Sequence, residues 1–146
     1  MSKRKAKEPS YIVPALERGL LLLQAFSKDK PVQSLGILAK ELDLPRATTF
    51  RLANTLEHLG FLIRDEESGE YRVGAAALKL GWTYLTGLEL PEIAYPFLSD
   101  LRYRTGASVH MSVREGTEVV YVSRLAAQAA LSSNIRVGSR LPAHAS

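Results

Sequence analysis

The side chains best placed to do chemistry in this sequence lie in "LPRATTFRLANTLEHLGFL", residues 44–62. Arg46, Thr48, Thr49 and Arg51 stand together at the start of the helix predicted there. Arginine pairs with guanine through two hydrogen bonds, and threonine can contact a base or a phosphate. The N-terminus of a helix also attracts phosphate through its partial positive charge. A helix that only packed against its neighbours would not need this group at its front end.

The predicted helix over residues 45–59 has an apolar side and a polar side, as expected of a helix that packs on one face. The inward positions are Thr49, Leu52, Ala53, Leu56 and Leu59. The outward positions are Arg46, Ala47, Phe50, Arg51, Asn54 and His58. Asn54 is suited to read adenine or hold a phosphate, and Phe50 to contact a thymine methyl group or a sugar. Gly60 is expected to end the helix.

Two earlier helices are predicted to support this segment. Residues 14–27 form the first, with Pro14 near its start and a stripe at Leu16, Leu20, Leu23 and Phe26 that Leu21 and Leu22 broaden. A stripe wider than one core needs indicates a second partner, which could be another copy of the chain. Ser34 is a good N-cap for a second helix over residues 35–43.

A turn of two or three residues separates the second and third helices, which is the spacing of a helix-turn-helix. Two short alternating runs, "FLIRD" and "EYRVG", follow around an acidic turn and predict a β-hairpin. Together these elements predict a winged helix-turn-helix that is complete by about residue 73. Arg64 and Arg72 flank the hairpin and, with Ser34 and the helix residues, complete the candidate DNA-contacting set. The acidic tip favours contact of the strands with the DNA backbone over deep insertion.

The remaining chain predicts further elements. Residues 74–88 form a helix that connects two domains, and Trp82 is interpreted as a packing residue on it. Residues 90–106 form another helix, which Pro96 is expected to bend. A strand hairpin around "REGTE" follows, then a third strand at "LSSNIRVG" and a loop at "SRLPAHAS".

The bulk composition is that of an ordinary globular protein. The chain has 146 residues, 46% of them hydrophobic, and a net charge of +4. It contains no cysteine and no apolar run long enough to span a membrane, and we expect a cytoplasmic protein. Residues 1–10 read as a basic flexible tail, in which Lys3, Arg4, Lys5 and Lys7 could serve as an arm for phosphates.

Catalysis and metal binding are not expected. No two of His58, His110 and His144 have the spacing of metal ligands on a helix. Ser112 lies two residues from His110, but the segment lacks the sharp turn and the acidic partner that activate a serine nucleophile. No glycine-rich phosphate loop is present, and we predict no cofactor.

The chain resembles the isocitrate lyase regulator (IclR) family of bacterial transcription factors. The segments that carry the resemblance are "PALERGLLLLQAF", "LGILAKELDLPRATTFRLANTLEHLGFL", "YRVGAAALKLG", "PFLSDLRYRTGASVHMSV" and "VGSRLPAHAS". The resemblance implies an α+β protein with a winged helix-turn-helix N-terminal domain over residues 11–73, a linker helix over residues 74–89 and a GAF-like α/β effector-binding domain from residue 90. That domain stops at Ser146 and is expected to be incomplete, which favours a fragment.

The family resemblance also implies a function. Such regulators bind palindromic promoter sites as dimers or tetramers, and a small organic or aromatic acid commonly controls them. On this resemblance Ser133, Leu141 and Ser146 fall where effector-binding residues occur, although a packing role for Leu141 and a surface role for Ser133 stay open. The alternative is a winged-helix module whose third helix meets a partner protein, for which outward Phe50 beside Ala47 is the best support.

Overall fold

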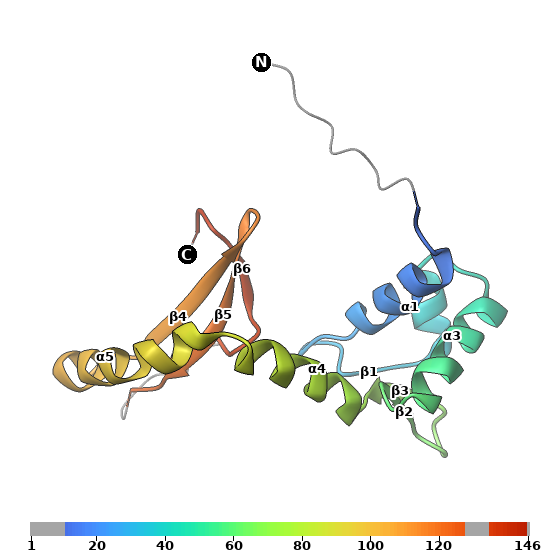
Figure 1. The fold of residues 1–146 in the computed structure, drawn as a ribbon. Coiled ribbons are helices and arrows are strands. Elements are labelled where there is room, and N and C mark those ends of the chain that lie inside the picture. Colours follow the sequence, from blue (N-terminus) through green and yellow to red (C-terminus); the bar gives the residue numbers. More distant parts are fainter. Residues whose placement is uncertain (1–10, 128–134, 146) are drawn as a thin grey trace. The chain divides into compact units, whose positions relative to one another are not determined.

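The computed structural model describes residues 11–127 and 135–145. The chain divides into two compact units, Met1–Gly81 and Trp82–Ser146, which we describe one at a time. The boundary between them falls within helix α4 (Ala75–Thr86) (Figure 1).

Unit 1 contains the three predicted helices. They are α1 (Pro14–Gln24), α2 (Leu35–Glu41) and α3 (Arg46–His58). The first two end earlier than the sequence patterns indicate, and α3 starts one residue after Pro45, which is its N-cap. Pro14 occupies the first turn of α1, where its missing N–H leaves no hydrogen bond unmade.

A small antiparallel sheet follows the helices in unit 1. Strands β2 (Leu62–Arg64) and β3 (Tyr71–Val73) form the predicted hairpin. A third strand, β1 (Val32–Gln33), lies between α1 and α2 in the chain and pairs with β3, so that the order is β1-β3-β2. Gln33 is almost fully buried, and its Nε2 donates to the carbonyl oxygen of Ala25 at 2.7 Å. This bond ties β1 to the end of α1.

The core of unit 1 takes one fully buried side chain from each of five elements. These side chains are Leu22 of α1, Leu38 of α2, Ala53 of α3, Leu62 of β2 and Tyr71 of β3. The hairpin therefore packs on the same core as the three helices. Its position relative to α3 is fixed by that packing.

The turn between α2 and α3 is tight, and one of its residues has an unusual backbone conformation. Asp43 has a φ of 51°, a left-handed conformation that aspartate tolerates better than most residues. The N–H of Leu44 then donates to the carbonyl oxygen of Ala39 at 3.0 Å. Ser34 caps α2 as predicted, with its hydroxyl oxygen accepting from the N–H of Ile37 at 3.4 Å.

Two glycines join the end of α3 to the start of α4. Gly60 ends the α3 segment with a φ of 75°, and its carbonyl oxygen accepts from the N–H of Ala76 at 3.2 Å. A Cβ at Gly74 would lie 2.2 Å from the same Gly60 oxygen. Gly74 therefore permits a backbone contact that any side chain would prevent.

Unit 2 contains α5 (Glu89–Thr105) and a second antiparallel sheet of β4 (Val109–Glu115), β5 (Glu118–Leu125) and β6 (Arg140–Pro142), in that order. Helix α5 continues through Pro96 and ends at Gly106, whose φ is 67°. The third strand differs from the prediction. It lies at Arg140–Pro142, which we expected to be a loop, whereas the described part of "LSSNIRVG" leads into a turn at Val137 and Gly138.

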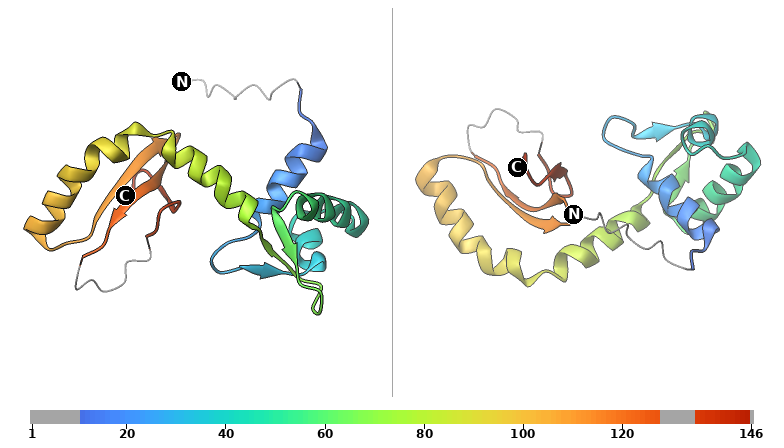
Figure 2. Two further views of the ribbon diagram at one scale, coloured as in Figure 1. Left: turned by 60° about the horizontal axis from the view of Figure 1, so that its bottom comes forward. Right: turned by 90° about the horizontal axis from the view of Figure 1, so that it is seen from above.

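Helix α5 packs along one face of this sheet, against β4 and β5 (Figure 2). The pairing of β4 with β5 shifts between Met111 and Ser112, where Val122 of β5 has no partner. Val109 and Val120 are buried on one face together with the half-buried Met111 and Val113, whereas Ser112 and Arg114 on the other face are exposed. We call this the helix-covered face. The opposite face, which we call the second face, carries His110 and Ser112 of β4 and their cross-strand partners.

Candidate nucleic-acid interface

The polar side of α3 is exposed, as the sequence predicts. Arg46, Phe50, Arg51 and Asn54 are all exposed, and Phe50 keeps 44% of its surface accessible. None of the ion pairs between described residues involves either arginine. Two unpaired guanidinium groups thus stand on the exposed side of a helix whose other side is held in the core.

One hollow lies between α3, the N-terminus of α2 and the hairpin, and we call it the wing hollow. It brings together four of the predicted contact residues, which are Ser34, Arg46, Phe50 and Arg64. Gly36, Ser68, Gly69 and Tyr71 also line it. Because the hydroxyl oxygen of Ser34 accepts a bond from α2, its O–H remains able to donate to a ligand.

Arg64 is held in place within the wing hollow. Its guanidinium lies 5.9 Å from the centre of the Tyr71 ring, a geometry that allows a cation–π interaction. Burial raises the pKa of the Tyr71 hydroxyl, and Arg64 opposes this shift. This contact favours a position of the Arg64 charge against Tyr71, in the wing hollow.

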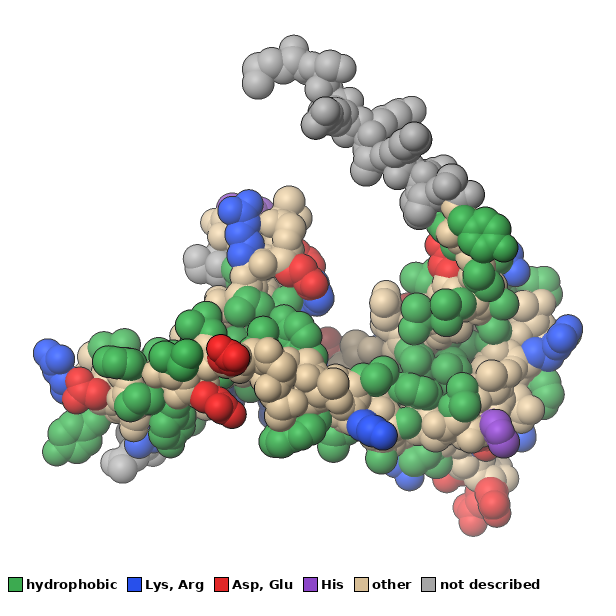
Figure 3. Space-filling model, in the orientation of Figure 1, with side chains coloured by type: hydrophobic (Ala, Val, Ile, Leu, Met, Phe, Trp, Pro, Cys, Tyr) green, Lys and Arg blue, Asp and Glu red, His purple; other side chains and the backbone are tan. Residues whose placement is uncertain are grey.

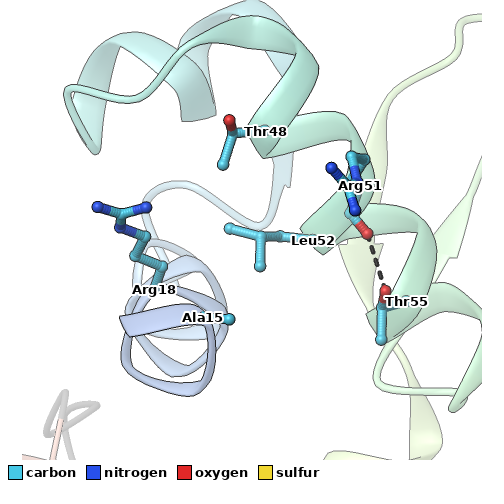
Figure 4. Close-up of a pocket in the computed structure, with 6 residues that line it drawn as sticks. All are labelled: Ala15, Arg18, Thr48, Arg51, Leu52 and Thr55. Carbon is cyan, nitrogen blue, oxygen red and sulfur yellow. Dashed lines mark hydrogen bonds between the residues drawn. The ribbon is translucent and has the colours of Figure 1, made fainter. Parts of the chain in front are cut away.

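A second hollow lies between α1 and α3, and we call it the helix hollow (Figure 4). Thr48 and Arg51 of α3 line it, together with Arg18 of α1. Arg18 was not among the DNA contacts predicted from the sequence. The available signal was that Arg18 is the only arginine in "PALERGLLLLQAF", a segment that is otherwise mostly apolar.

Two expectations for α3 are wrong. Thr49, which the sequence placed both inward and among the DNA contacts, is fully buried, and its hydroxyl donates to the carbonyl oxygen of Pro45 at 3.2 Å. It cannot reach a ligand from there. Leu59, expected to face inward, is 56% exposed because α3 ends at His58 and Leu59 is its C-cap.

Arg72 does not join the other predicted contacts. It pairs with Val32 and Ile63, so it lies on the face of the sheet opposite to Tyr71 and Arg64. There it lines a separate apolar hollow with Phe26 and Pro31. Alternation along β3 thus separates two arginines that the sequence placed together.

The acidic tip of the hairpin builds its own turn. The carboxylate of Asp65 accepts from the backbone N–H of Ser68 at 2.8 Å and from its hydroxyl at 2.9 Å. These bonds from Ser68 hold the pKa of Asp65 below its usual range. Glu66 and Glu67 are exposed at the tip.

The predicted effector-binding residues are only partly described. Leu141 lies in β6 and is half-buried. It pairs with Val119, which pairs with Arg114, so Leu141 belongs to the second face of the sheet in unit 2. Ser133 and Ser146 lie outside the described residues.

The described residues contain neither a cluster of metal ligands nor a helix that could span a membrane. Between residues 11–127 and 135–145 there is no group of three or more acidic, histidine or cysteine side chains placed to hold a metal ion. No helix in the same ranges has the length and apolar character that crossing a membrane requires.

The fold and this surface define a winged helix-turn-helix protein with a second α/β unit. Residues 15–66 match the family model of the IclR helix-turn-helix domain. Residues 82–146 match that of the C-terminal domain of bacterial IclR transcriptional regulators. The chain belongs to the IclR family, which consists of transcriptional regulators and not of enzymes.

Several relatives support this assignment. The chain is 33% identical over 132 residues to the HTH-type transcriptional repressor AllR of Escherichia coli K12, an alignment covering 90% of this chain and 49% of AllR. The chain therefore spans about half the length of the curated relatives that it matches.

Solved structures of family members share the fold. An IclR family regulator from Brucella abortus superposes with a TM-score of 0.81 at 30% identity, covering 97% of this chain and 53% of the regulator. An IclR homologue from Microbacterium hydrocarbonoxydans, solved in complex with 4-hydroxybenzoate, gives 0.74 at 29% identity and covers 90% and 55%.

Proposed function

We propose that this chain is the DNA-binding part, with a portion of the effector-binding part, of a cytoplasmic transcriptional regulator that reads a palindromic promoter site. The observation that carries the proposal is the arrangement of Arg18, Arg46, Arg51 and Arg64. They come from α1, α3 and β2, form no ion pair with a described residue, and line two hollows on either side of α3.

The contacts divide by the reach of each side chain. The N-terminal residues of a recognition helix come closest to base edges in the major groove. Arg46, Arg51 and Asn54 therefore read bases, and Thr48 and Phe50 make the shorter contacts beside them. Ser34, Arg18 and Arg64 lie on neighbouring elements and are suited to hold phosphates on both sides of the groove.

The proposed active form is a homodimer or tetramer. Leu16, Leu20 and Leu21 of α1 are 62%, 50% and 45% exposed, and hydrophobic side chains gather over this helix at the surface (Figure 3). Apolar side chains grouped in this way mark an interaction surface. A two-fold pair of DNA-binding units would match a palindromic site.

A small organic or aromatic acid is the proposed effector of unit 2. The support is that a homologue of similar fold was solved with 4-hydroxybenzoate. Leu141, Ser133 and Ser146 remain the proposed lining residues for this ligand.

A gel shift with the DNA that flanks the protein's own gene tests the DNA-binding proposal. Phosphate contacts release counterions, so binding should weaken steeply between about 50 mM and 200 mM salt. Specific DNA should compete better than random DNA of equal length. Equal competition at both salt concentrations, or no binding at all, would favour the alternative of a protein-interaction module that uses Phe50 and Ala47.

A further inference from the structure

We propose that His110, Tyr121 and Arg124, on the second face of the unit 2 sheet, form an anchor for the carboxylate of a small organic acid. The proposal rests on the proposed function, in which unit 2 binds an effector, and adds the residues that hold its charged end. None of these three residues was selected from the sequence as an effector contact.

The three side chains lie together because of the strand register. His110 of β4 is directly opposite Arg124 of β5, and Ser112 is opposite Tyr121. His110 and Ser112 lie two residues apart on β4 and share one face. On β5 the register shift at Val122, which has no partner, brings Tyr121 and Arg124 to that same face although they are three residues apart. The rings of His110 and Tyr121 meet edge to face, with their centres 5.8 Å apart.

Two nitrogen atoms in this cluster are buried without a hydrogen-bond partner among the described residues. They are Nε2 of His110 and Nε of Arg124. A buried polar group that makes no hydrogen bond is costly, so native proteins nearly always supply a partner. An arginine Nε only donates, and His110 donates from Nε2 when that nitrogen carries the hydrogen. With the hydrogen of His110 on Nε2, both nitrogens are donors, and one acceptor group could serve them both.

The described carboxylates of unit 2 do not serve as this acceptor. Asp100 pairs with Arg104, while Glu115 and Glu118 both pair with Arg140. The two others among described residues, Glu89 and Glu92, lie in the first turn of α5, which covers the other face of the sheet. His110 and Arg124 thus face each other with no described negative charge between them.

The geometry points to a carboxylate. Side chains directly opposite on antiparallel strands have Cβ atoms about 4.5–5.5 Å apart, so both donors can reach one small group. A carboxylate offers two coplanar oxygens, one for each donor, and its bond to arginine is charge-assisted. One arginine carries a single positive charge, so it matches a carboxylate better than the two negative charges of a phosphate dianion.

Binding measurements on the chain test this inference. Titration calorimetry with benzoate and 4-hydroxybenzoate should give binding for at least one of these acids. The neutral 4-hydroxybenzamide and inorganic phosphate should bind much more weakly. Arg124→Gln and His110→Gln should each weaken the acid by roughly tenfold or more, because each removes a hydrogen bond to a charged group.

Arg114→Gln is the matched control. Arg114 is an exposed arginine on β4 that donates from Nε to the carbonyl oxygen of Gly116, so its loss changes the charge equally but leaves the cluster intact. It should leave acid binding unchanged. If Arg124→Gln does not fold, Arg124→Lys replaces it in the experiment. This variant keeps the positive charge but lacks the Nε–H, and it should also bind the acid more weakly. Wild-type protein should melt at a higher temperature with the acid present, and Arg124→Gln should not.

Three results would overturn the inference: no acid binds, phosphate binds as well as the acids, or Arg124→Gln and Arg114→Gln behave alike. A gel shift on the same samples separates this failure from failure of the proposed function. If DNA binding is retained while the Arg124 variant binds acid normally, only the anchor is wrong. If the acid binds through Arg124 but no DNA is bound, the anchor stands and the DNA-binding proposal fails.

Discussion

The two units bury their side chains to different degrees. In unit 1, five elements each contribute one side chain that is at most 2% exposed. Among the described residues of unit 2 the most buried apolar side chain, Val122, is 5% exposed, while Phe97 and Tyr103 of α5 are 72% and 86% exposed. Unit 1 thus closes a core around α3 and holds its arginines on a rigid support. Unit 2 leaves apolar and polar groups that further contacts could satisfy.

Truncation of one buried side chain in each unit should give the largest difference. Leu22→Ala should lower the free energy of unfolding of unit 1 by about 2–5 kcal/mol, because it leaves a cavity in a closed core. Val122→Ala should lower that of unit 2 by only about 1.6 kcal/mol, the value expected from two lost methyl groups. Hydrogen exchange reports each unit separately. Equal losses in the two units would contradict the comparison.

The glycine junction between α3 and α4 should be the next most sensitive point. Gly74→Ala should destabilise unit 1 by about 1–3 kcal/mol, because the new Cβ would collide with the Gly60 carbonyl oxygen. Gly81→Ala is the control, since its Cβ meets nothing within 4 Å and alanine favours a helix. Urea denaturation should show loss for the first variant and a slight gain for the second. Similar curves for both would mean that the junction is not tight.

Measurements of DNA binding should distinguish an arginine that reads a base, Arg51, from one that holds a phosphate, Arg18. Arg51→Ala should cost about 1–3 kcal/mol and relax the preference at one base pair. Arg18→Ala should weaken all DNA sequences alike and lower the salt slope by about 1, because one phosphate contact is lost. Gel shifts with specific and random DNA at several salt concentrations measure both effects. The assignment fails if Arg18→Ala changes the base preference and Arg51→Ala does not.

The smallest expected effect concerns the hairpin tip. Because the pKa of Asp65 is lowered from 3.8, its bonds to Ser68 stabilise the turn above pH 3.8 and are lost as the pH falls through the lowered value. Ser68→Ala should bring the pKa back toward 3.8, with no change at neutral pH. Carboxyl NMR titration of Asp65 reads this directly. Alanine keeps the backbone N–H of residue 68, which lowers the pKa most, so the return should be partial. A titration that is the same in both proteins would exclude a contribution from the Ser68 hydroxyl.

Most of unit 1 was predictable because its helices carry clear local signals. Pro14, Ser34, Pro45 and Gly60 mark helix ends, and the leucine spacing gives the helical faces. Strand β1 was not predictable, because two residues give no alternation and their strand conformation depends on pairing with distant β3. In unit 2 the third strand was misplaced for the same reason, since pairing with β5 selects Arg140–Pro142.

The candidate site was predictable where it lies on one helix. Arg46, Phe50, Arg51 and Asn54 follow from the period of α3. The position of Arg72 depends on which face of β3 packs on the core, and Arg18 joins the site only because α1 packs against α3. The unpaired nitrogens of His110 and Arg124 likewise depend on strand register, which the sequence does not reveal.

The most direct test of the account is amide NMR of the chain with and without promoter DNA. We expect the largest shift changes around the two hollows, at residues 34–36, 46–54 and 64–69 and at Arg18. The amide shifts of Val32, Ile63 and Arg72, on the outer side of the unit 1 sheet (the face opposite to Tyr71 and Arg64), should change little. Changes concentrated on that outer side, with α3 unaffected, would contradict the claim that the exposed side of α3 meets DNA.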